Sequence, residues 1–166
     1  MHLVTTKFYH YGFSFVILPA QIYVFILTKK VLKFEIDLDF VLIAINTPLK
    51  DYRVCHFINK YLHFNFKKTP DLAVDIFQVI TEPAFFSIYH YQWETTETDF
   101  YFIANKGSEG LLIPEMREVD YFFMIKNFID DTDLNNIISA LNRIPEIMAA
   151  VKIEPKKIKS RENLLF

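Results

Sequence analysis

The spacing of apolar and polar residues predicts both strands and helices along this chain. Apolar residues that alternate with polar ones, or that form short unbroken runs, are typical of strands. Apolar residues that recur every three or four positions indicate helices. The first pattern predicts extended segments at residues 31–46, 72–80, 85–93, 98–105, 111–114, 119–126 and 147–153.

The second pattern predicts two helices. Thr47 is a favourable N-cap and Pro48 suits a first helical turn, so the first helix is expected to run from there to Leu62. Acidic residues at 130–133 predict the start of the second helix, because negative charge there opposes the helix dipole. An apolar stripe continues that helix until Pro145 ends it.

Turn signals at residues 94–97, 106–110 and 115–118 separate the central extended segments, as in an antiparallel meander. With a helix on either side along the chain, the meander predicts an α+β fold. Two helices would pack on one face of the antiparallel sheet, in a variant of the ferredoxin-like arrangement. The other sheet face, or the sheet edge at Pro114, would then be the contact surface.

Residues 1–30 differ from the rest of the chain. They contain three lysines, no acid and an apolar run at 13–27, which as a helix would be about 22 Å long, shorter than the hydrocarbon core of a membrane. We consider three interpretations: an upstream extension if translation begins near Val31, a membrane anchor, or an ordered part of the domain. The length predicts one α+β domain, placed at residues 31–166, with 1–30 as a hydrophobic extension.

Composition and charge exclude several classes of protein. Hydrophobic residues make up 52% of the 166 residues and charged residues 23%, which is typical of a globular chain. Residues 31–166 hold all 20 acids but 15 of the 18 lysines and arginines, a net charge of -5, which argues against nucleic acid as a partner. The single cysteine, Cys55, excludes an internal disulfide and fits a cytoplasmic location. Membrane attachment is expected only through residues 1–30.

No motif of a common enzyme class is present in the sequence. It contains no glycine-rich phosphate loop, no G-x-S-x-G motif and no histidine spacing suited to zinc. We therefore expect no cofactor and no metal site built from histidine or cysteine.

The acidic residues around position 115 offer candidate chemistry. If the extended segments on either side of this turn form a hairpin, Ile113 faces Asp120 and Glu115 lies close to Asp120. Two carboxylates so placed could bind Mg²⁺ or divide the roles of acid and base. Alternatively, they accept hydrogen bonds that fix the turn, or pair with Arg117, Arg53 or a lysine of the C-terminal tail. Asp51, Arg53 or Asn105 beside these acids and Tyr121 would favour an enzyme, whereas a packed turn would favour a structural role.

The same segment carries a resemblance. Ile113-Pro114-Glu115 and Val119-Asp120-Tyr121, separated by three residues, match the pattern for which the IPExxxVDY family of small bacterial proteins is named. The chain resembles this family also in the ending at residues 159–166 and at Asp51, Tyr52, Arg53, Cys55 and Asn59. Family members have about the length of residues 31–166. The resemblance implies no known activity, substrate or cofactor.

Two functions follow as hypotheses. The first is a non-enzymatic binding or regulatory module that acts on a protein partner or forms a homodimer. The alternative is a carboxylate-dependent, metal-assisted hydrolase centred on Glu115 and Asp120. The candidate functional residues are Pro114, Glu115, Asp120, Tyr121, Asp51, Arg53, Asn59 and Asn105.

Overall fold

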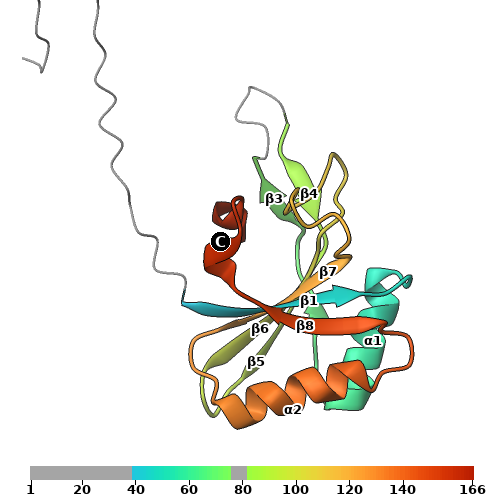
Figure 1. Ribbon diagram of the computed structural model, residues 1–166, viewed down its shortest axis with the longest axis vertical. Helices are drawn as coiled ribbons and strands as arrows, with labels where there is room; N and C mark the ends of the chain where they lie inside the picture. The colour runs from blue at the N-terminus through green and yellow to red at the C-terminus, as the bar shows by residue number, and fades with distance from the viewer. Residues whose placement is uncertain (1–38, 76–81) are drawn as a thin grey trace, which may run out of the picture. The chain divides into compact units, whose positions relative to one another are not determined.

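A computed structural model describes residues 39–75 and 82–166 of the chain (Figure 1). All of these residues belong to one compact unit, Asp37–Phe166. The three interpretations of residues 1–30, the strand expected at 31–38 and most of the extended segment at 72–80 lie outside the described residues. Among the helices that the structure describes, none has the length and apolar character needed to cross a membrane.

A six-stranded antiparallel sheet forms the centre of the unit, in the order β2-β5-β6-β7-β1-β8. Its strands are β1 (Phe40–Asn46), β2 (Lys67–Lys68), β5 (Ile88–Trp93), β6 (Thr98–Ala104), β7 (Tyr121–Lys126) and β8 (Ala149–Ile153). The predicted meander is confirmed, because β5, β6 and β7 are consecutive in the chain and adjacent in the sheet. Two further strands, β3 (Leu72–Val74) and β4 (Ala84–Phe86), form a separate small sheet.

Two helices, α1 (Asp51–Leu62) and α2 (Asp131–Asn142), pack on one face of the large sheet, as predicted (Figure 1). Their buried residues form one apolar cluster with the residues of β1, β6 and β7 that face them. Aromatic side chains fill much of this cluster. The ring centroid of Phe64, for example, is 5.0 Å from the ring centroids of both Tyr91 and Phe100.

The strand order gives this core the ferredoxin-like connectivity. Strands β1 and β6 run in the same direction on either side of β7, and α1 lies between them in the sequence. Strands β7 and β8 likewise run in the same direction on either side of β1, with α2 between them in the sequence. Two interleaved β-α-β units in the order β8-β1-β7-β6 define this arrangement. Of the four strands that the structure describes between α1 and β6, β5 and β2 extend the sheet at its β6 side, and β3 and β4 form the separate small sheet.

The second face of the sheet is covered, contrary to the expectation of an open face. Side chains of β1, β6 and β7 on this face form a second apolar cluster with the β6–β7 loop, β4 and the C-terminal tail. The tail contains two short 3₁₀ helices, η1 (Pro155–Lys157) and η2 (Arg161–Leu164). Leu164 is fully buried there, so the tail docks on the domain through this side chain.

Three predicted boundaries were wrong. Helix α1 begins at Asp51, because the Thr47 side chain hydrogen-bonds across the molecule and Lys50 occupies the N-cap position. The extended segment at 85–93 is two strands separated at Ser87. Residues 111–114 form no strand, and only Leu111 makes an isolated bridge, to Lys106.

Candidate functional site

The motif segment joins β6 to β7 as a double turn and not as the predicted hairpin. The backbone N–H of Met116 donates to the carbonyl oxygen of Ile113 (3.0 Å), and that of Val119 donates to the carbonyl oxygen of Met116 (3.1 Å). Pro114 occupies the second position of the first turn, where its fixed φ is favourable. Ile113 and Val119 are buried against the sheet while Pro114 is exposed. The double turn therefore packs on the sheet through its apolar residues.

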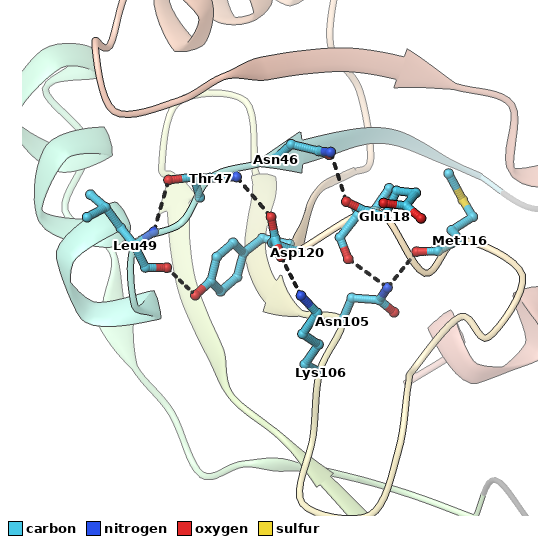
Figure 2. A network of polar contacts seen from close by, with 10 residues as sticks. Asn46, Thr47, Leu49, Asn105, Lys106, Met116, Glu118 and Asp120 are labelled. Atoms are coloured by element: carbon cyan, nitrogen blue, oxygen red, sulfur yellow. Dashed lines mark hydrogen bonds and ion pairs between the residues drawn. The ribbon is translucent and has the colours of Figure 1, made fainter.

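The fully buried side chain of Asn105 holds this double turn in place (Figure 2). Its Nδ2 donates to the carbonyl oxygens of Met116 and Val119, both at 2.9 Å. Its Oδ1 accepts a hydrogen bond from the backbone N–H of Ile113 at 2.9 Å. One amide thus bonds three backbone groups, and two of them, the N–H of Ile113 and the carbonyl oxygen of Val119, would otherwise be buried without a partner.

Asp120 links the double turn to the end of β1 (Figure 2). Its Oδ2 accepts a hydrogen bond from the backbone N–H of Thr47 (3.0 Å), and its Oδ1 pairs with Nζ of Lys106 (2.7 Å). The hydroxyl of Thr47 in turn donates to the carbonyl oxygen of Glu146 (2.7 Å). Both carboxylate oxygens of Asp120 are therefore used within the protein.

Tyr121 is buried, and its hydroxyl donates to the carbonyl oxygen of Leu49 at 2.7 Å (Figure 2). Its ring stacks on Phe102 with the ring centroids 4.8 Å apart. Burial and the nearby negative charges of Asp51 and Asp120 raise the pKa of Tyr121 to about 12. The phenol therefore stays protonated at neutral pH and serves as a hydrogen-bond donor.

Glu115 binds the C-terminal tail. Its Oε1 accepts from the backbone N–H of Ser160 (2.8 Å) and its Oε2 from the hydroxyl of the same residue (3.0 Å). Partial burial acts to raise the pKa of Glu115, but hydrogen bonds from Ser160 and its neighbours outweigh it and lower that pKa. Beside it, Nδ2 of Asn163 donates to the carbonyl oxygen of Leu112 (2.8 Å), so the tail and the double turn are joined twice.

The two candidate carboxylates thus bind different parts of the chain. Glu115 is bonded to the tail, whereas Asp120 is bonded to Lys106 and to the segment between β1 and α1. The hairpin geometry that would have placed them together does not form, because residues 111–114 are not a strand. Among the residues that the structure describes, no group of three or more His, Cys, Asp or Glu side chains could hold a metal ion.

Asp51 is the one α1 candidate that approaches the motif. Its Oδ2 accepts hydrogen bonds from the hydroxyls of Ser87 and Tyr89, the latter at 3.3 Å. The negative charge of Asp51 also helps to raise the pKa of Tyr121. Burial and the charge of Asp51 raise the pKa of Cys55 to about 12. This buried thiol therefore stays protonated near neutral pH, which makes Cys55 unsuited to act as a nucleophile.

The two other α1 candidates lie apart from the motif. Asn59 hydrogen-bonds both backbone groups of Phe66, at 2.8 and 3.2 Å, and so fixes the chain that follows the helix. Arg53 lies on the exposed side of α1. The structure therefore unites Asn105, Asp120 and Tyr121 around the double turn, with Asp51 next to Tyr121.

Sequence reasoning missed the partners of these residues. Thr47 was expected as a helix cap and Lys106 as a turn residue, yet both bind Asp120, at sequence separations of 73 and 14 residues. Ser160 also went unassigned. Its only signal is its place in the ending that resembles the IPExxxVDY family.

Comparisons of this chain with protein-family models, curated proteins and solved structures find no match. The resemblance to the IPExxxVDY family therefore stays a prediction.

Proposed function

We propose that this protein is a non-enzymatic binding or regulatory module of the protein-interaction type, in which the double turn is a structural clamp. The observation that carries the proposal is the internal use of the polar side chains of this segment. Glu115, Asp120, Tyr121 and Asn105 all direct their polar atoms to partners within the chain. A reaction centre needs groups that can contact a substrate, and these groups are already occupied.

We also propose that the chain is a member of the IPExxxVDY family. Five of the six fixed positions of the pattern have side chains that are buried or hydrogen-bonded, such as Ile113, Glu115 and Asp120, and the sixth, Pro114, is exposed and occupies the second position of the first turn. At the three variable positions, the hydrogen bonds use the backbone: the carbonyl oxygens of Met116 and Glu118 accept from Asn105 and Asn46 (Figure 2). Any residue can supply a carbonyl oxygen, which would explain why only these positions vary.

The alternative, a carboxylate-dependent hydrolase centred on Glu115 and Asp120, has less support. Mg²⁺ usually keeps several of its waters and is held by one or two carboxylates, whose oxygens must be accessible to the hydrated ion. Binding an ion at Asp120 would displace Lys106 and the backbone N–H of Thr47. An ion at Glu115 would displace Ser160.

Substitution of the two acids separates these functions. We expect Glu115→Gln and Asp120→Asn each to lower the free energy of unfolding, because each weakens charge-assisted hydrogen bonds. We expect Mg²⁺ to leave the melting temperature of the wild-type chain and of both variants unchanged. Glu109→Gln, in the neighbouring exposed turn, is the matched control and should melt like the wild type.

A bound ion stabilises the folded state by mass action, so the melting temperature is a direct test. Stabilisation of the wild-type chain by Mg²⁺ that is lost in Glu115→Gln or Asp120→Asn would favour the hydrolase and overturn the proposal.

A further inference from the structure

Helix α1 has an exposed face that is both aromatic and basic. Its buried side consists of Val54, Cys55 and Ile58. Residues spaced four apart share a helix face, so the opposite side presents a continuous set of exposed residues. We call this set the basic-aromatic face; it consists of Tyr52, Arg53, His56, Lys60 and Tyr61.

This face contains no acid. The one acidic residue of α1, Asp51, is turned to Ser87 and Tyr89. Tyr52 is 59% exposed and Tyr61 45% exposed. Tyrosine and arginine are the residues most often found at the energetic centre of protein interfaces.

A second exposed surface has the opposite charge. The β5–β6 turn and the β7–α2 loop lie side by side. Nδ2 of Asn127 donates a hydrogen bond to the carbonyl oxygen of Glu97 (2.7 Å), and the hydroxyl of Thr98 donates one to the carbonyl oxygen of Phe128 (2.6 Å). Residues 94–99 and 127–133 include six acids and no lysine or arginine. We call the exposed acidic and aromatic residues of this surface the acidic corner; they are Glu94, Glu97, Phe128, Asp130 and Asp131.

Helix capping explains only part of this corner. Asp130 caps α2, since its Oδ1 accepts from the backbone N–H of Asp133 at 2.8 Å. Neither Glu94 nor Glu97 belongs to that helix, and capping does not require Phe128, whose side chain is 69% exposed. An exposed aromatic ring surrounded by carboxylates is the chemistry that an aromatic surface with arginine and lysine would bind.

The two surfaces lie at different ends of the unit that contains both. In Figure 1, α2 begins at the lower left, beside the β5–β6 turn, and runs toward α1 at the right. With 12 residues, α2 alone separates them by about 18 Å. One folded copy therefore cannot bring its own acidic corner onto its own basic-aromatic face.

The edges of the sheet offer less to a second copy. Ala150 of the edge strand β8 has both backbone groups bonded to the side chain of Asn142, at 2.8 and 2.9 Å. The opposite edge is the two-residue strand β2, which consists of the exposed Lys67 and Lys68. Short or lysine-bearing edges disfavour strand pairing between molecules.

We propose that copies of this protein associate head to tail, with the acidic corner of one copy seated on the basic-aromatic face of the next. The inference rests on the proposed interaction function and specifies a second copy as the occupant. Charge complementarity carries it: Arg53 and Lys60 meet the carboxylates, and the exposed ring of Phe128 meets Tyr52 or Tyr61. Because the two surfaces differ, the contact is heterologous, and a pair of bound copies leaves one acidic corner and one basic-aromatic face free for further copies.

Two double variants of the full chain test this geometry. Arg53→Glu with Lys60→Glu reverses the charge of the basic-aromatic face, and Glu94→Lys with Phe128→Ala disrupts the acidic corner by reversing one charge and removing its aromatic ring. The mass is measured by light scattering or sedimentation over a range of concentrations at low salt. We expect the wild-type mass to rise with concentration above 19.7 kDa and each double variant alone to stay at that value.

The equimolar mixture of the two variants gives the sharpest outcome. Each pair keeps one intact acidic corner and one intact basic-aromatic face, so the mixture should form dimers of twice 19.7 kDa and nothing larger. Lys152→Glu with Lys156→Glu, two exposed lysines outside both surfaces, makes the same change in net charge as Arg53→Glu with Lys60→Glu and should assemble like the wild type.

Three results would overturn the inference: a wild-type chain that is monomeric at every concentration, a mixture that stays monomeric, or either double variant that assembles alone. A monomeric wild type would leave the interaction function to a different partner. Stabilisation by Mg²⁺ that depends on Glu115 or Asp120 would instead overturn the proposed function, whatever the mass.

Discussion

Asn105 is the residue on which the double turn depends most. Its side chain makes hydrogen bonds to Ile113, Met116 and Val119 in a site that excludes water. Asn105→Ala leaves the N–H of Ile113 and the carbonyl oxygen of Val119 without partners, and each such group costs about 1–3 kcal/mol. We therefore expect the free energy of unfolding, measured by urea titration, to fall by about 3 kcal/mol.

Asn135→Ala, at an exposed position of α2, is the matched control and should change that free energy by less than about 0.5 kcal/mol. A loss at Asn105 no larger than the loss at Asn135 would contradict the assigned role.

Glu115 predicts a dependence on pH. Because its pKa in the folded protein is lowered below the ordinary value of 4.5, its hydrogen bonds to Ser160 add stability above that value. This contribution disappears as the pH falls through the folded pKa. The difference in unfolding free energy between the wild type and Glu115→Gln should therefore be constant near neutral pH and shrink as the pH falls below 4.5. A difference that stays constant over the whole range would show that the charge of Glu115 contributes nothing.

At the residue scale, the sequence identified polar residues that matter but not what they bind. Asn105, Asp120 and Tyr121 were candidates because of their type and place. Their partners are mostly backbone groups of other elements, such as the N–H of Thr47. Backbone groups leave no mark in a sequence, so these contacts could not be predicted.

Among the elements, the C-terminal tail is most open to test. Leu164 of η2 is fully buried in the second apolar cluster, whereas its neighbour Leu165 is 46% exposed. We expect Leu164→Ala to lower the free energy of unfolding by about 2–5 kcal/mol, since it leaves a cavity in a packed layer. Leu165→Ala is the matched control and should cost much less. Equal effects, measured by denaturant titration, would mean that the tail is not part of the folded core.

Periodicity predicted the helices and the meander because one side of each of these elements faces the core. Helix α1 ends at Leu62 as expected, and α2 begins after the acidic cap at Asp130. The same reasoning failed for residues 111–114, because an apolar run looks alike in a strand and in a loop that packs on a sheet. Leu112 and Ile113 are fully buried, yet their backbone turns instead of pairing.

For the whole molecule, the order of elements in the sequence favoured the ferredoxin-like arrangement. The strand order β8-β1-β7-β6 in the sheet is that of this arrangement. The covering of the second sheet face was not foreseen, because the β6–β7 loop and the tail that build it have no regular spacing. The same covering removes the open face that was expected as a contact surface.

The charged surfaces on α1 and at the start of α2 are then the candidates for association. At a salt concentration of about 1 M the Debye length is about 3 Å, so the attraction between these surfaces is screened. We therefore expect such salt to dissociate the head-to-tail assembly, which the mass in solution would show.

The position of β1 has a consequence for synthesis on the ribosome. This strand lies between β7 and β8, so neither neighbour exists when residues 40–46 leave the exit tunnel. The first residue of β7 is Tyr121, and at about 5–20 residues per second the nascent strand waits several seconds for it. Its buried residues, Leu42 to Ile45, are exposed through that interval. The growing chain therefore exposes an unpaired apolar strand, and we expect a chaperone that binds apolar segments to bind it during synthesis.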